Sequence, residues 1–184
     1  MKITRVPLIL LFCFAPFAAA GELEGVKMDA TADVAGKTVK LQGMGLRTKL
    51  MFKVYVAGLY LETPDKDAAK VIAADEVKRV QLHLVRDLAG GKIAEAIVEG
   101  FERNSKAEMP KLKERLDRMT AMIPDVKIGD VIVFTYVPGK GTDVTVKGES
   151  KGTLEGKDFG DALFAVWLGA SPVQEDLKAA LLGS

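Results

Sequence analysis

The stretch GMGLRTKLMFKVYVAGLYLE, residues 43–62, combines two close glycines, one arginine and a long apolar run. We expect a tight turn at Gly43 and Gly45. A strand over Leu50–Leu61 should follow, because Val, Tyr, Phe and Leu dominate that run. Gly58 inside the run predicts a bulge or a close approach of another part of the chain. The stretch therefore predicts the centre of a β-sheet.

Two polar side chains in this stretch form a candidate anion site. Arg47 follows the glycines, and Tyr55 lies eight positions further on. A guanidinium presents paired donors that match a carboxylate, and a tyrosine hydroxyl adds another hydrogen bond. The same residues also fit a solvated arginine beside a hairpin and a core tyrosine with a wet tip. The spacing leaves open whether the two residues share one strand or lie on neighbouring strands.

Alternating apolar and polar residues predict strands on both sides of this stretch. The alternation over Val26–Val34 indicates a half-buried strand, and Ala35–Lys37 indicates a turn. The other predicted strands are Thr38–Leu41, Val77–Arg86, Val131–Val137, Asp143–Lys147 and a short one at Thr153–Leu154.

Helical signals fill the rest of the chain. Apolar residues repeat at helical spacing between Ile93 and Ile123, and further helices are predicted at Asp65–Ala74 and Phe159–Leu168. Ser171-Pro172-Val173-Gln174 predicts the start of a last helix, with Ser171 as N-cap and Gln174 as its capping-box partner. Strands and helices do not alternate regularly. This order favours an α+β fold, a large antiparallel sheet with helices on one face.

The first twenty residues have the order of a secretory signal peptide. Lys2 and Arg5 form a basic region, Val6–Phe17 an apolar region and Ala18–Ala20 a small-residue cleavage site. The apolar region is shorter than the roughly 20 residues that a membrane-spanning helix needs. We therefore expect residues 1–20 to be removed and residues 21–184 to form an exported domain without a transmembrane segment. In a Gram-negative bacterium that domain would be periplasmic.

Composition excludes several classes of function. Cleavage would remove Cys13, the only cysteine, so the mature chain has neither a disulfide nor a thiolate metal ligand. Loss of Lys2 and Arg5 changes the net charge from +1 to −1, which gives no electrostatic footprint for nucleic acid. The single histidine, His83, makes a zinc site untenable. We predict no metal and no cofactor.

One catalytic motif occurs without its structural context. Gly148–Gly152 fits the pattern G-x-S-x-G, but strands are predicted on both sides of Ser150. A nucleophile elbow needs a strand-to-helix turn and a histidine that follows the serine. His83 precedes it, so we interpret this segment as a polar hairpin turn.

From Gly43 onward the chain resembles the chalcone isomerase fold, in particular its exported bacterial chalcone-isomerase-like members. GMGLR and FKVYVAGLYLE resemble the two central strands of that family. KIGDVIVFTYVPGKGTDV, KDFGDALFAVWLGASP and LKAALLG resemble its second hairpin and its terminal helices. The resemblance implies a large antiparallel sheet backed by a helical layer, with a ligand cleft between them.

The resemblance also assigns roles to two residues. Arg47 matches the family arginine that faces the cleft and receives the anionic end of the ligand. Tyr55 stands where plant isomerases have a threonine, and tyrosine at this point resembles the fatty-acid-binding branch, in which Arg and Tyr together hold a carboxylate. A tyrosine and an asparagine of the enzymes are replaced within Ala89–Gly91 and Ala94–Ala96, and a hydroxyl residue is replaced near Gly160. We therefore predict no catalytic residues.

The leading hypothesis is a non-catalytic periplasmic binding protein for a small amphipathic acid, in particular a fatty acid, held by Arg47 and Tyr55. Two alternatives stay open. One is an isomerase or lyase acting on a conjugated ketone, with Arg47 as oxyanion stabiliser. The other is an interaction module with a vestigial cleft, in which Arg47 pairs with an internal carboxylate. The sequence identifies no protein partner.

Overall fold

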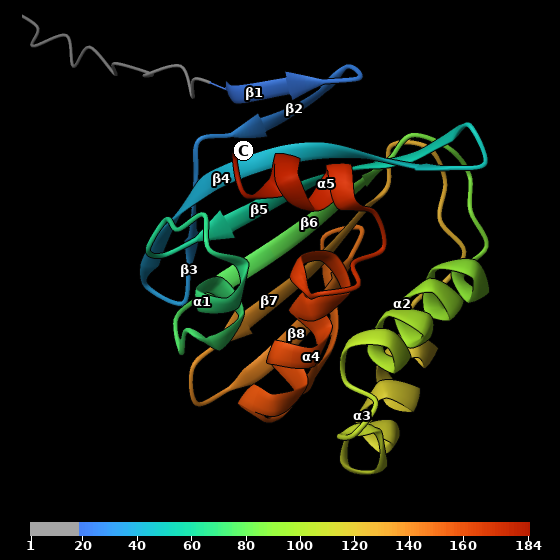
Figure 1. Cartoon of the computed structure of the whole chain (residues 1–184). Helices are drawn as coiled ribbons and strands as arrows, with labels where there is room; N and C mark the ends of the chain where they lie inside the picture. Colours follow the sequence, from blue (N-terminus) through green and yellow to red (C-terminus); the bar gives the residue numbers. More distant parts are fainter. Residues whose placement is uncertain (1–18) are drawn as a thin grey trace, which may run out of the picture.

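Seven antiparallel strands follow one another in chain order across the main sheet of the computed structural model, which describes residues 19–184 (Figure 1). They are β3 (Thr31–Val34), β4 (Lys37–Lys49), β5 (Phe52–Leu61), β6 (Lys78–Leu84), β7 (Val131–Val137), β8 (Gly141–Val146) and β9 (Glu149–Leu154). Two further strands, β1 (Ala19–Leu23) and β2 (Val26–Asp29), form a separate hairpin.

Five helices cover one face of the main sheet. They are α1 (Ala68–Ala73), α2 (Gly90–Asn104), α3 (Met109–Ala121), α4 (Lys157–Leu168) and α5 (Glu175–Leu181). Each helix contributes at least one buried side chain to the same core cluster, which also contains Tyr55, Ala57 and Leu59 of β5. The predicted α+β fold, an antiparallel sheet backed by helices, is therefore confirmed.

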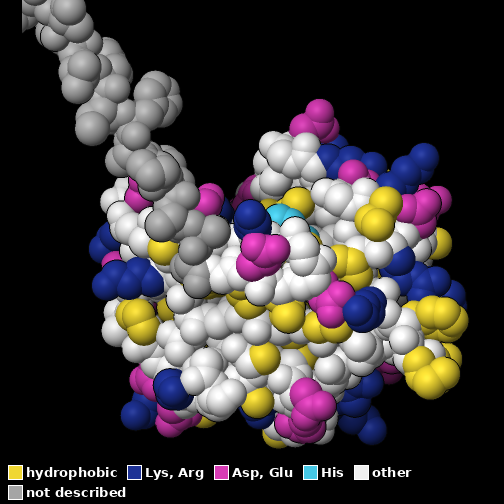
Figure 2. Space-filling view, turned by 90° about the horizontal axis from the view of Figure 1, so that it is seen from above, with side chains coloured by type: hydrophobic (Ala, Val, Ile, Leu, Met, Phe, Trp, Pro, Cys, Tyr) yellow, Lys and Arg dark blue, Asp and Glu magenta, His cyan; other side chains and the backbone are white. Residues whose placement is uncertain are grey.

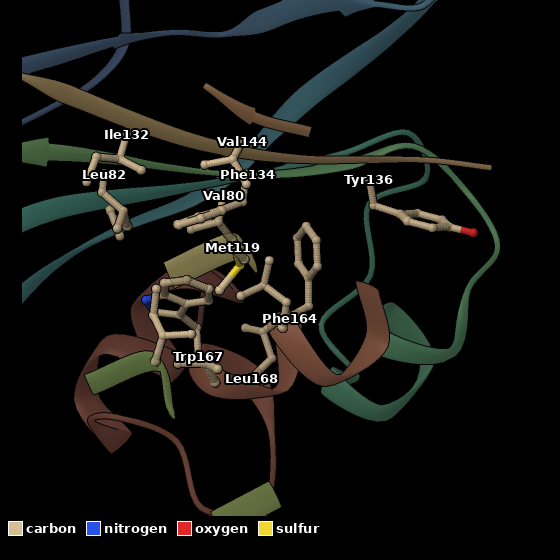
Figure 3. Close-up of a cluster of buried hydrophobic side chains, with 14 of the residues drawn as sticks. Val80, Leu82, Met119, Ile132, Phe134, Tyr136, Val144, Phe164, Trp167 and Leu168 are labelled. Atoms are coloured by element: carbon tan, nitrogen blue, oxygen red, sulfur yellow. The ribbon is translucent and has the colours of Figure 1, made fainter. Parts of the chain in front are cut away.

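Helix α4 lies at the centre of this layer. Its side chains Phe164, Trp167 and Leu168 point toward residues of β6, β7 and β8 (Figure 3). The rings of Trp167 and Phe134 are 5.7 Å apart between centroids. Nine residues of α4 are buried. The helix is therefore apolar on nearly every side, as expected for a helix enclosed by protein.

The opposite face of the sheet is covered by the β1–β2 hairpin. Alternate residues of β5, Val56 and Tyr60, point to this side and form a second cluster with Met28. A Cβ atom added at Gly58 would lie 2.2 Å from Sδ of Met28. The close approach predicted at Gly58 is therefore real, and it brings Met28 onto the sheet.

The predicted strand over Val26–Val34 is wrong in one respect. The chain bends at Ala30, so that β2 belongs to the small hairpin and β3 to the main sheet. The alternation of apolar residues continues across the bend because both pieces bury one side, Met28 in β2 and Val34 in β3. Periodicity alone cannot detect such a change of sheet.

The turn predicted at Gly43 and Gly45 is also wrong, because both residues lie inside β4. Helix α5 packs so closely here that a Cβ atom at Gly43 would lie 2.2 Å from the carbonyl oxygen of Ala180. The glycines therefore make room for a helix. The turn comes later, at Leu50 and Met51, so β5 begins at Phe52.

The last helix begins later than predicted. Glu175 is the first residue of α5, and Gln174 occupies the N-cap position without a capping hydrogen bond from its side chain. Ser171 and Pro172 lie in the preceding loop. The Gln174 side chain points instead to β4, as described below.

The predicted signal peptide falls mainly outside the described residues, since β1 begins at Ala19. Within residues 19–184, no helix has the length and apolar character needed to cross a bilayer.

Candidate ligand-binding site

Arg47 and Tyr55 lie directly opposite each other on neighbouring strands. Arg47 of β4 pairs with Tyr55 of β5 in the antiparallel register, so both side chains point to the helix-covered face. The register then shifts, because the next pair is Thr48 with Lys53. Val54 is the extra residue of this bulge. The structure therefore answers the question that the spacing left open: the two residues are cross-strand neighbours.

A cavity of about 340 Å³ lies beside this pair, between the sheet and the helices α2 and α4. Its lining is mainly apolar and consists of Arg47, Lys49, Leu50, Phe52, Val54, Tyr55, Leu82, Arg86, Leu88, Lys92, Ile93, Ala96, Ile97, Val166, Trp167 and Val173. The described lining residues include four cations and no carboxylate. Such a cavity suits a ligand with an apolar body and a negative charge.

Tyr55 presents a neutral hydroxyl to this cavity. The side chain is only 8% exposed, and burial raises the pKa of the phenol, while Trp167 and Arg47 act in the opposite direction. The Tyr55 hydroxyl oxygen accepts a hydrogen bond of 3.0 Å from Nε1 of Trp167. Because a phenol has one hydrogen to donate, this contact leaves the Tyr55 proton for another acceptor.

Arg47 is held by neutral groups. Its Nη1 donates to the carbonyl oxygen of Thr48 and, over 3.2 Å, to Oε1 of Gln174. Oε1 of Gln174 also accepts from the backbone N–H of Thr48, and Nε2 of Gln174 donates to the carbonyl oxygen of Leu46. Within residues 19–184 no carboxylate forms an ion pair with Arg47. The guanidinium is thus held in place by neutral groups, and no carboxylate of the described residues neutralises its positive charge.

Three further cations lie toward the exposed end of the cavity. Lys92 pairs with Glu95 over 2.8 Å, and the guanidinium of Arg86 lies 4.7 Å from the ring centroid of Phe52. Lys49 is exposed at the end of β4. These residues give the mouth of the cavity a positive character that should attract anions.

Two residues of the site were not predicted as site residues. Gln174 suggested a helix cap, and its contacts with β4 depend on packing between segments 127 residues apart. Trp167 lies within the segment KDFGDALFAVWLGASP, which resembles the family. It is the only tryptophan of the chain, and this was the one feature of the sequence that could have marked it as a site residue. The basic mouth gave no local signal, because its cations come from three separate segments, the end of β4, the residues after β6 and the start of α2.

Ala89, Ala96 and Gly160 lie in the segments where the family resemblance implies that polar groups of the enzymes have been replaced. Ala96 lines the cavity, Ala89 is the N-cap of α2, and Gly160 packs against the ring of Tyr136. Among residues 19–184 there is also no group of three or more His, Cys, Asp or Glu side chains arranged to hold a metal ion. The described site offers hydrogen-bond donors and apolar surface.

Comparison with known proteins agrees with this architecture. The sequence model of the chalcone isomerase-like family matches residues 20–183. Among solved structures, a fatty-acid binding protein of Arabidopsis thaliana is similar to this chain, with a TM-score of 0.69 at 17% sequence identity. The alignment covers 86% of this chain and 92% of that one, so the likeness concerns the fold as a whole. No curated protein matches the sequence.

Proposed function

The chain belongs to the chalcone isomerase-like family, and from this premise we propose that it binds a small amphipathic acid, in particular a fatty acid, without catalysis. One observation carries the proposal. Arg47 and Tyr55, paired across two strands, meet at the wall of an apolar cavity whose described lining contains no acidic residue. The fold shared with a plant fatty-acid binding protein supports it.

The polar end of the ligand would meet two complementary donors. The Arg47 guanidinium can bind a carboxylate with two parallel hydrogen bonds. The Tyr55 hydroxyl can donate a third, because Trp167 already uses the oxygen as acceptor. An alkyl chain would then lie against apolar lining residues of β6, α2 and α4, such as Leu82, Ile97 and Val166.

An isomerase is the first alternative. The lining contains no histidine or carboxylate that could act as general base, and Ala96 offers no hydrogen bond. We expect a chalcone added to the protein to cyclise at the background rate. A saturable, stereoselective formation of the flavanone would favour the enzyme.

An interaction module with a vestigial cleft is the second alternative. It would require a filled cavity or an internal carboxylate on Arg47, and the described residues provide neither. Lipid extraction and native mass spectrometry of the purified protein separate this alternative from binding, because only a binding protein should carry an acid.

We also propose that the protein is exported and works in the periplasm after removal of residues 1–20. The support is the basic, apolar and small-residue order of its N-terminus. Intact mass and N-terminal sequencing of the periplasmic fraction test this proposal, and an uncleaved chain retained in the membrane would contradict it.

Replacing the arginine tests the binding site itself. Arg47→Ala should weaken the binding of a fatty acid by roughly ten- to hundredfold, because a charge-assisted contact to the carboxylate is lost. Arg47→Lys should recover little, since an ammonium lacks the planar fork. Tyr55→Phe should cost less, about threefold to tenfold, as it removes one neutral donor. Titration calorimetry with acids of increasing chain length gives these affinities.

The matched control is Arg79→Ala, which removes a half-buried arginine on the other face of the sheet, where Arg79 donates to the hydroxyl of Thr135. It should leave the affinity unchanged. Unchanged binding by Arg47→Ala, or a large loss of thermal stability without ligand, would show that Arg47 is structural.

A further inference from the structure

The β4–β5 hairpin ends in exposed apolar residues. Leu50 and Met51 form its two-residue turn and are 83% and 98% exposed, and Phe52, the next residue, is 60% exposed. Ile128, in the loop before β7, is 68% exposed. These are the large hydrophobic side chains that stand exposed among the described residues. We call the four residues the apolar tip.

The turn itself is unusual when compared with the other hairpins of the chain. Four hairpins in residues 19–184 have two-residue turns with positive φ at both positions. The other three turns are Glu24-Gly25, Ala35-Gly36 and Lys147-Gly148, each with glycine at the second position. Met51 occupies that position in the β4–β5 turn at a φ of 68°. A methionine there costs backbone energy that glycine would not, and it exposes apolar surface.

All members of the apolar tip lie at one end of the sheet, which is also the end where the cavity opens. Leu50 and Phe52 line the cavity mouth. Ile128 lies at the same end, because its loop leads into Val131, which pairs with His83 near the end of β6, and it shares a surface hollow with Lys53 of β5. Figure 2 shows hydrophobic side chains that protrude at the right-hand edge, where Figure 1 places the β4–β5 hairpin.

Cations surround the apolar tip. The acidic side chains Glu24, Glu95 and Asp130 at this end each pair with a lysine, Lys53, Lys92 and Lys147. A fourth acidic residue, Asp87, accepts from the backbone N–H of Ile128 and forms no ion pair with a described residue. Lys49, Arg86 and Lys127 form no ion pair with any described residue. The three cations outnumber Asp87, so the end of the sheet combines protruding apolar side chains with an excess of positive charge.

We propose that the apolar tip docks this protein on the surface of a lipid bilayer that contains anionic phospholipids. Apolar side chains that insert at the headgroup boundary, together with nearby Lys and Arg, are the combination that binds such surfaces. A docked tip would bring the cavity mouth to the membrane, where amphipathic acids are concentrated. The docking is inferred from the apolar tip and its cations alone, whereas a role of docking in the transfer of acids rests on the proposed function.

A vesicle-binding experiment tests the docking with ligand-free protein. Wild-type protein should sediment with phosphatidylcholine vesicles that contain phosphatidylglycerol, and much less with pure phosphatidylcholine or at high salt, because screening weakens the attraction. Met51→Gly should bind the anionic vesicles about tenfold more weakly, since it loses one apolar side chain that would insert into the bilayer. The same variant should melt at a higher temperature, because glycine accepts the positive φ.

One control and one further variant accompany Met51→Gly. Ala35→Gly also places a glycine at a positive φ, 50°, at the first position of the β3–β4 turn at the opposite end of β4, and it should not alter vesicle binding. Lys127→Glu changes only a charge beside Ile128 and should weaken binding to anionic vesicles without altering binding to neutral ones. Met51 and Lys127 do not line the cavity.

Three outcomes would overturn the proposal. They are wild-type protein that stays unbound on anionic vesicles, Met51→Gly that binds as tightly as the wild type, and a wild-type dimer in sedimentation that Met51→Gly converts to a monomer. The last would make the apolar tip a contact between two copies of the chain. Failure of fatty-acid binding in solution would refute the proposed function and leave the vesicle result standing.

Discussion

At the scale of single residues, Gln174 shows how a neutral side chain prepares a charged site. Its amide accepts from Arg47 and from the N–H of Thr48, and it donates to the carbonyl oxygen of Leu46. These contacts tie the start of α5 to β4 and hold the guanidinium in place. An amide does this without neutralising Arg47, whereas a carboxylate in its place would compete with an acidic ligand.

Lys78 is a second residue whose position matters, because its charge lies in the core. The side chain is 2% exposed, and its Nζ donates to the carbonyl oxygens of Val71, Ile72 and Ala74 at the end of α1. Asp161 lies 3.6 Å away. Burial lowers the pKa of Lys78 from 10.5 to about 8, against the opposing effect of Asp161. Lys78 thereby joins α1 to the sheet.

This pKa predicts a dependence of stability on pH. Between about pH 8 and pH 10.5 the unfolded chain keeps a proton on Lys78 that the folded protein has lost. The contribution of this group to the free energy of unfolding therefore rises with pH in that window, by up to roughly 3 kcal/mol, and is constant below it. Denaturant unfolding at several pH values should show the rise in wild-type protein relative to Lys78→Met. A difference that stays flat or falls above pH 8 would disagree with a buried, depressed lysine.

At the scale of elements, the contact between β4 and α5 controls the site. Gly43 and Gly45 give the helix a flat strand surface, and the helix in turn carries Gln174 at its start. At Gly43 an added Cβ would meet backbone oxygens of Ala180 and Leu181, whereas at Gly45 it would meet side-chain carbons. Backbone atoms of a helix cannot move without moving the helix, so a larger side chain is tolerated less well at Gly43 than at Gly45.

We accordingly expect Gly43→Ala to cost about 3 kcal/mol or more of stability, because α5 has to move away. Fatty-acid affinity should fall with it, as Gln174 shifts from Arg47. Gly91→Ala is the control, since an added Cβ there meets nothing within 4 Å, and it should be neutral or stabilise the helix by ~0.5 kcal/mol. Thermal melts and calorimetry measure both effects. A stable Gly43→Ala protein with unaltered affinity would mean that the close contact is unimportant.

At the scale of the whole molecule, the sheet separates two hydrophobic clusters, and only the one on the helix side borders the cavity. The helix side contains the large cluster and the cavity, and the other side contains a smaller cluster capped by Met28 of the β1–β2 hairpin. Residues of the smaller cluster do not line the cavity. Stability and ligand binding should therefore be separable by the face of the sheet that is changed.

Met28→Ala should lower the free energy of unfolding by roughly 2–5 kcal/mol and leave fatty-acid affinity unchanged, because the lost contacts lie on the far face. Ile97→Ala, on the cavity side, should weaken binding by about tenfold through lost apolar contact. Unfolding curves and titrations of both variants give the comparison. Equal loss of affinity in the two variants would show that the faces are coupled.

The sequence by itself determined the type of most elements. The strand that contains Tyr55, the buried helix at Phe159–Leu168 and the turn at Ala35 all followed from the spacing of apolar residues and from local turn chemistry. These are properties of a few neighbouring residues. Arg47 and Tyr55 were candidates from residue type and from family resemblance, and both line the cavity.

Tertiary structure alone decided how these candidates meet. Arg47 faces Tyr55 because the chain reverses at Leu50 and Met51, one turn later than the glycines suggested. Trp167 reaches Tyr55 across 112 positions in sequence, and Gln174 reaches Arg47 across 127. Local periodicity carries no information on such distances. They depend on where α4 and α5 pack on the sheet, and that is settled by the total burial of apolar surface in the folded chain.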